Sequence, residues 1–275
     1  MTVKTKALLF FLLFTSVTTQ AQRLITTSNK CYKKIQEGNK LNDAGQYDQA
    51  FNAFTDIIKD CSAKDAKEEG NVGLATAANG LERYEQAIDC ANAAIKLSKK
   101  KNVMAYYARS FAYTKLGQNH EAREDLMHIT ELTKKNKNVK ARATMFAQLA
   151  QIDFQLNRIA QADSNLIKAS ELDPTNPAFF IQKGDINVKL KNYNDAFVAY
   201  DQVLDLGKRD LEIYQIRTEA RLKQYQEKYN TLDAKQLAKR MTTSEKKTLC
   251  VDLNKSVELG LRNLQLELLG TMICE

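Results

Sequence analysis

The stretch Pro177–Asp210, PAFFIQKGDINVKLKNYNDAFVAYDQVLDLGKRD, has the pattern of two short amphipathic helices joined by a tight turn at residues 191–193. In the first helix, Phe180, Gly184 and Asn187 recur three or four residues apart, so they share one face. The second helix has a predicted buried stripe made of Ala196, Tyr200, Val203, Leu204 and Leu206. A hairpin this small cannot cover such stripes alone, so it requires similar neighbours.

The rest of the chain repeats this hairpin at a regular interval. The clearest mark is the start of the second helix, where a residue that is usually aromatic or apolar is followed three positions later by alanine. The interval is about 34 residues, lengthened in places by short insertions, and self-similarity at such a period indicates stacked supersecondary units. The alanines that carry the mark are Ala50, Ala87, Ala122, Ala162 and Ala196.

The pattern resembles the tetratricopeptide repeat, which has small residues at positions 8 and 20, glycine at 15, an aromatic residue at 17 and a large apolar residue at 24. Repeat one shows these as Gly38, Gly45, Tyr47, Ala50 and Phe54. The resemblance implies an all-α fold, a right-handed superhelical solenoid of antiparallel helix pairs. Five units are predicted, at residues 31–64, 68–101, 103–136, 143–176 and 177–210.

Residues 211–275 are predicted to form a degenerate sixth unit with an insertion and a capping helix. Its first helix is expected at residues 211–223 and its partner at 244–259, with Thr243 or Ser244 as the N-cap. The extra residues, 225–243, should lengthen one helix or add a short one. A last helix at 261–273 would cover the end of the stack. The expected buried stripe of the partner helix is Leu249, Leu253, Val257 and Leu259.

Residues 1–21 have the order of a secretory signal peptide, with Lys4 and Lys6 before the apolar run 7–14 and cleavage expected after Ala21. The alternative is an uncleaved anchor. Loss of this leader, which carries two lysines and no acid, changes the net charge from +8 to +6. We therefore expect a periplasmic or extracellular protein with no transmembrane segment in the mature chain and no nucleic-acid partner, and peripheral membrane contact is left open.

Five cysteines in an exported chain predict disulfides. In a helical hairpin, residues equidistant from the turn lie opposite each other. Cys31 and Cys61 lie at equal sequence separations on either side of Gln46, at the centre of the first turn. Cys250 and Cys274 are likewise equidistant in sequence from the turn expected after Gly260. We predict the pairs Cys31–Cys61 and Cys250–Cys274, and a free, buried thiol at Cys90.

The sequence offers no positive argument for catalysis. It contains no nucleophile elbow, phosphate-binding glycine loop or paired-histidine zinc motif. The two histidines, His120 and His128, have no cysteine or carboxylate at a spacing that would complete a metal site. The prediction is a non-enzymatic protein without cofactor or metal.

The resemblance implies a concave groove lined by the first helix of each unit. A protein or peptide partner is expected there, with Tyr107 and Phe111 as exposed aromatic anchors, although the same two rings could instead pack on the adjacent repeat. The predicted lining residues are Ile35, Gln36, Asn39, Asp43, Val72, Thr76, Tyr107, Phe111, Lys115, Gln148, Gln151, Gln155, Ile181, Gln182 and Asp185.

Two functions follow from this architecture. The first is a non-catalytic scaffold of the cell envelope that holds a partner in the groove. The alternative is a structural accessory of a larger envelope or secretion assembly, which would use its outer surface and a basic edge. That edge would comprise the lysine runs at 99–101 and 134–140, which both fall between repeats. Lysines kept simply for solubility are the third interpretation of these runs.

Overall fold

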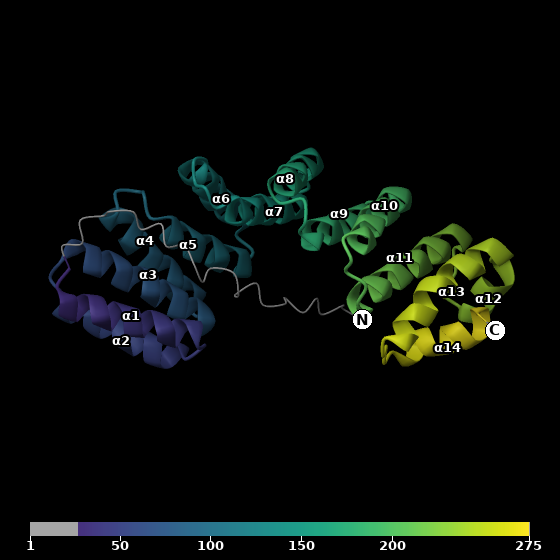
Figure 1. Cartoon of the computed structure of the whole chain (residues 1–275), viewed down its shortest axis with the longest axis horizontal. Coiled ribbons are helices and arrows are strands. Elements are labelled where there is room, and N and C mark those ends of the chain that lie inside the picture. Colours follow the sequence, from purple (N-terminus) through teal and green to yellow (C-terminus); the bar gives the residue numbers. More distant parts are fainter. Residues whose placement is uncertain (1–26, 275) are drawn as a thin grey trace. The chain divides into compact units, whose positions relative to one another are not determined.

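The computed structural model describes residues 27–274, so the predicted signal peptide lies outside the described part. Residues 27–274 form fourteen helices and no strand (Figure 1). The prediction of an all-α chain is confirmed. The helices are α1 (Asn29–Asp43), α2 (Tyr47–Asp60), α3 (Lys64–Gly80), α4 (Tyr84–Leu97), α5 (Val103–Lys115), α6 (Asn119–Thr133), α7 (Val139–Gln155), α8 (Ile159–Leu172), α9 (Pro177–Lys189), α10 (Tyr193–Asp205), α11 (Leu211–Tyr229), α12 (Ala234–Arg240), α13 (Thr243–Glu258) and α14 (Leu264–Ile273).

The stretch at 177–210 forms the predicted hairpin. Helix α9 begins with Pro177 at its first turn, where a proline needs no backbone donor, and Asn176 caps it by accepting from the Ala178 amide at 3.1 Å. A Cβ on Gly184 would lie 2.2 Å from the Tyr200 ring, so this glycine permits the close approach of α10. Ala196, Tyr200 and Val203 are buried. Leu206 was predicted to be buried, but it follows the last turn of α10 and is 40% exposed.

The chain divides into two compact units between residues 145 and 146, within α7. In the first unit the Phe54 side chain, at position 24 of repeat one, is fully buried. A Cβ on Gly38 of α1 or Gly73 of α3 would lie 2.7 or 2.3 Å from the tip of the ring. The large residue therefore fills the gap between one repeat and the next, and two glycines make room for it.

The insertion in the second unit uses both of the predicted solutions. Helix α11 continues to Tyr229 and ends at Asn230, whose φ of 47° is left-handed, and the short helix α12 follows. Helix α13 is capped one residue earlier than predicted, by Thr242, because a reciprocal pair of hydrogen bonds joins Thr242 and Glu245. Helix α14 starts at Leu264 instead of Leu261, because Asn263 provides its cap.

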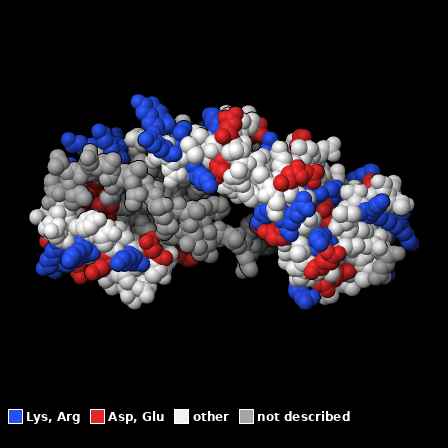
Figure 2. All heavy atoms as spheres, in the orientation of Figure 1, with Lys and Arg blue, Asp and Glu red and all other residues white. Residues whose placement is uncertain are grey.

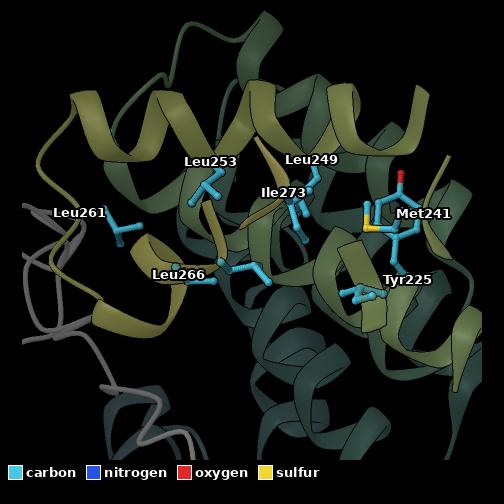
Figure 3. Close-up of a cluster of buried hydrophobic side chains, with 9 residues drawn as sticks. Tyr225, Met241, Leu249, Leu253, Leu261, Leu266 and Ile273 are labelled. Atoms are coloured by element: carbon cyan, nitrogen blue, oxygen red, sulfur yellow. The ribbon is translucent and has the colours of Figure 1, made fainter. Parts of the chain in front are cut away.

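The C-terminal helices share one hydrophobic core (Figure 3). Leu249 and Leu253 of α13 are buried in it as predicted. Val257 and Leu259, predicted to continue that stripe, are 47% and 40% exposed, because the buried face of α13 continues through Ser256 instead. The members from the other segments are Tyr225, Leu237, Met241, Leu261, Leu266, Leu269 and Ile273.

A buried ion network joins three helices of the second unit. Arg217 on α11 contacts Asp252 on α13 at 3.0 Å and also pairs with Asp201 on α10. Arg221 reaches the other oxygen of Asp252 at 2.8 Å and lies 4.0 Å from the centre of the Phe197 ring. Burial opposes the charge of Arg217, but its two carboxylate partners raise the pKa of the guanidinium. The network holds α11 to both α10 and α13.

Both predicted disulfides are present. Cys31 and Cys61 have their Cα atoms 6.1 Å apart, and Cys250 and Cys274 have theirs 5.6 Å apart. One bond joins the ends of the first hairpin and the other links α13 to the residue after α14. Cys90 is a free thiol, as predicted, but it is half-buried and not fully buried. Burial raises the pKa of this thiol.

Candidate partner-binding surfaces

The first helices of repeats one to three, α1, α3 and α5, are fixed to one another by buried asparagines. The Asn42 side chain donates to the Gly73 carbonyl at 3.1 Å, and Asn79 donates to the Ala108 carbonyl at 2.8 Å. These asparagines both stand at position 12 of their repeats and link α1 to α3 and α3 to α5. The Oδ1 atom of each is buried without a hydrogen-bond partner.

Neither Asn42 nor Asn79 is among the lining residues predicted from the sequence. The signal was available, because the same polar residue recurs at position 12 in two successive repeats. Each buried amide donates a hydrogen bond to the neighbouring helix and so fixes the spacing of the two helices. If that bond broke, the amide N–H would also be buried without a partner, which is costly. The surface formed by α1, α3 and α5 is therefore pre-organised.

The predicted lining residues of the first unit differ in exposure. Gln36, Asn39, Asp43 and Lys115 are exposed, and Thr76, Tyr107 and Phe111 are half-buried. Ile35 and Val72 were predicted to line the groove, but they are only 5% and 8% exposed. Ile35 packs in the core around Phe54, where the shared apolar face of α1 and α2 needs it. These two residues are therefore removed from the candidate surface.

The aromatic residues of α5 are partly covered and not fully exposed as predicted. The Lys115 ammonium lies 5.3 Å from the centre of the Phe111 ring, one turn earlier on the same helix. A lysine over an aromatic face is held by a cation–π attraction while its charge stays in water. The pair offers a partner an apolar ring and a positive charge side by side.

The predicted lining residues of the second unit lie on α7 and α9. Gln182 donates to the Ala147 carbonyl at 2.9 Å and lies 3.5 Å from the Gln151 side-chain oxygen. The Tyr200 hydroxyl donates to Asp185 at 2.8 Å, so that carboxylate already has an internal partner. Gln148, Gln151, Ile181 and Gln182 are half-buried, and Gln155 and Asp185 are exposed. This surface is rich in amides and contains one apolar side chain.

Metal and histidine chemistry can be assessed for residues 27–274. No group of three or more histidine, cysteine or acidic side chains within that range could hold a metal ion. His128 is half-buried, with its ring centre 4.4 Å from that of Tyr106 and its Nε2 atom 3.3 Å from the Lys100 carbonyl. His120 is exposed. The described residues also include no helix with the length and apolar character needed to cross a membrane.

These features define an all-α protein built from stacked helical hairpins. The tetratricopeptide repeat family matches residues 105–136 and 143–176. Residues 105–136 and 143–176 are therefore tetratricopeptide repeats, and the chain is similar to tetratricopeptide-repeat proteins. A curated relative, Protein unc-45 homolog B from Danio rerio, is 26% identical over 195 residues, which are 66% of this chain. The chain spans about a fifth of that relative, 21% of its length.

Solved structures share the fold at low sequence identity. A tetratricopeptide repeat protein from Parabacteroides merdae aligns over 90% of this chain and all of its own, with a TM-score of 0.60 and 16% identity. PilF from Pseudomonas aeruginosa aligns over 88% of this chain and 96% of its own, with a TM-score of 0.61 and 16% identity. MamA from Desulfovibrio magneticus aligns over 66% of this chain and 97% of its own, with a TM-score of 0.57 and 17% identity. The fold indicates a protein–protein interaction scaffold.

Proposed function

We propose that this chain is a non-catalytic scaffold of the cell envelope that holds a segment of a partner protein against the α1, α3 and α5 surface. The proposal rests on a cluster of aromatic, charged and polar side chains on that surface. Phe111 and Lys115 present an apolar ring beside a positive charge, and Asn39 of α1 and Thr76 of α3 lie at the equivalent position 9 of their repeats. Aromatic anchors flanked by polar groups are typical of peptide-binding sites.

The envelope location is supported by cysteine usage. Four of the five cysteines form disulfides, and such bonds persist in oxidising compartments such as the periplasm. The amide-rich surface of α7 and α9 is a candidate contact area of the second unit. Its glutamines suit an extended segment, because amide side chains can bond to both backbone donors and backbone acceptors.

The test compares capture of partners by residues 22–275 and by the double variant Tyr107→Ala/Phe111→Ala. The matched control is Met127→Ala/Ile167→Ala, which removes two exposed apolar side chains from the second helices α6 and α8. We expect the groove variant to lose proteins that the parent and the control both retain. Equal capture by all three chains, each with an unchanged melting temperature, would refute the groove as the binding site.

A photo-crosslinking amino acid locates the contact directly. Placed at Asn39 or Thr76 it should label the captured partner, and placed at Met127 it should not. The reverse result would favour the accessory function, in which the outer surface of the protein makes the contact.

A further inference from the structure

One margin of the first unit is lined by exposed lysines. The loop after α4 carries Lys99, Lys100 and Lys101, and the loop after α6 is followed by the first turn of α7. We call six exposed residues of these segments the lysine edge: Lys99, Lys100, Lys101, Lys135, Lys137 and Lys140. None of the six forms an ion pair within residues 27–274, whereas the neighbouring Lys134 pairs with Glu131.

Packing of α5 against α6 brings the two loops to the same margin. His128, in the second half of α6, packs against Tyr106 in the first turns of α5 with the two rings tilted, and its Nε2 atom lies 3.3 Å from the Lys100 carbonyl. The end of α6 therefore lies beside the start of α5, which is where the other loop ends. Figure 2 shows blue side chains gathered at the upper left, over the loops that join α4 to α5 and follow α6 in Figure 1.

The first loop is held in a fixed conformation. Lys99 and Lys100 have φ values of 53° and 66°, a region that side-chain-bearing residues seldom adopt. Ser98 accepts from the backbone amides of Lys101 and Asn102, and Asn102 donates to the buried Glu68 at 2.7 Å. Three consecutive ammonium groups thus project from an ordered backbone and not from a loose tail.

Exposed apolar side chains stand next to these lysines. Met104, at the second position of α5, is 41% exposed, and Val139, the first residue of α7, is 42% exposed. Leu132, near the end of α6, is 38% exposed. A margin that served solubility alone would gain nothing from exposed apolar groups beside its charges. Lysines with adjacent apolar side chains are the pattern of surfaces that enter the boundary between water and lipid.

The chemistry of the cations narrows the partner further. The two loops, residues 98–102 and 134–138, contain six lysines and no arginine. Arginine suits the planar, bidentate recognition of one carboxylate, whereas lysine is a hydrated point charge on a flexible stem. Several such charges along one margin fit an anionic surface whose headgroups move. We propose that the lysine edge binds membranes that contain anionic lipids, with Met104 and Val139 entering the headgroup layer. This proposal goes beyond the groove function.

The experiment is co-sedimentation of residues 22–275 with phosphatidylcholine vesicles, with and without phosphatidylglycerol. Binding is expected only to the anionic vesicles, and added salt should weaken it. The edge variant has glutamine in place of five lysines, Lys99, Lys100, Lys101, Lys135 and Lys137. Its partitioning onto anionic vesicles should fall by at least about a hundredfold, since each lysine near an anionic surface contributes roughly fivefold. The control with equal charge has glutamine at Lys40, Lys235, Lys239, Lys246 and Lys247, and it should bind much more tightly than the edge variant.

A second variant tests the apolar contribution. Met104→Ser/Val139→Ser should bind anionic vesicles several-fold more weakly and keep the salt dependence of the parent. Equal binding to both vesicle types, or equal loss in the edge and control variants, would overturn the proposal. So would binding to soluble polyglutamate without binding to vesicles, which would indicate an acidic protein. Partner capture by the groove is measured without lipid, so the two proposals can fail separately.

Discussion

The first and last helical hairpins, α1–α2 and α13–α14, both carry a disulfide but are packed by different means. In the first, Gly38 and Gly73 leave room for the fully buried Phe54 ring. In the last, Leu249 and Leu253 pack among other leucines, and Asp252 on the same helix accepts two arginines. The first hairpin follows the repeat pattern, and the last departs from it.

The difference shows how a helical hairpin can lose the sequence pattern of the repeat and still pack at the end of the stack. Close packing through small residues is encoded locally, so each repeat needs its own glycines and alanines. Helix α13 buries Leu249, whereas α2, α4, α6, α8 and α10 each bury an alanine at their fourth residue. A buried ion network joins α13 to α11, and its geometry is demanding, because an unpaired buried charge is costly.

The largest effect is expected from breaking that network with Asp252→Asn. The substitution removes the negative charge that two arginines share and leaves Arg217 buried with one remaining partner. We expect a loss of about 4 kcal/mol in the free energy of unfolding, measured by urea denaturation. The control Asp163→Asn changes an exposed residue of α8 and should cost less than about 0.5 kcal/mol. A loss at Asp252 no greater than the control would show that the network is dispensable.

Removal of either disulfide comes next. Cys31→Ser/Cys61→Ser opens a loop with a sequence separation of 30, and Cys250→Ser/Cys274→Ser opens one of 24. Each pair should lower the free energy of unfolding by about 3 kcal/mol, because the unfolded chain regains the entropy of the open loop. The control Cys90→Ser should have a smaller effect. Five reactive thiols in the unreduced, denatured parent chain, in place of one, would contradict the pairing.

Local regularity also decides how much of this molecule could be predicted. The helices of the five repeats and both disulfides follow from spacing, because each depends on residues within one hairpin. Ile35 and Val72 were misplaced because their positions indicate a helix face but not how deeply that face is covered by the next repeat. The pairing of Arg217 with Asp252 joins residues 35 apart across an irregular insertion, so its spacing differs from that of Arg109 and Asp125, which pair 16 apart in repeat three.

A glycine substitution sharpens the comparison between the two ends. Gly73→Ala would place its Cβ 2.3 Å from the Phe54 ring, whereas Gly270→Ala would place its Cβ 3.2 Å from the flexible end of Leu253. We expect a loss of about 2 kcal/mol at Gly73 and a much smaller change at Gly270, by urea denaturation. The double variant Gly73→Ala/Phe54→Leu should recover part of the loss. Equal losses at both glycines would mean that the first hairpin is no more tightly packed than the last.

The smallest effect concerns the N-caps and depends on pH. Helix α2 has no side-chain cap, whereas Glu245 closes the cap of α13 and also accepts from Lys228 at 2.6 Å and Tyr229 at 2.7 Å. Partial burial opposes the charge, but these bonds and those from Thr242 lower the pKa of Glu245 from 4.5 to about 2. A lowered pKa stabilises the folded chain above pH 4.5, and this support is lost as the pH falls toward 2.

Glu245→Gln should therefore cost about 1 kcal/mol near neutral pH, and the difference from the parent should shrink between pH 4.5 and 2. Thermal unfolding followed by circular dichroism across that range measures it. The control Asp48→Asn alters the acid in the first turn of α2, which closes no capping box, so its effect should be smaller. A pH-independent penalty at Glu245 would mean that its shape and not its charge supports the helix, and the last hairpin would then resemble the first in having no ionised cap.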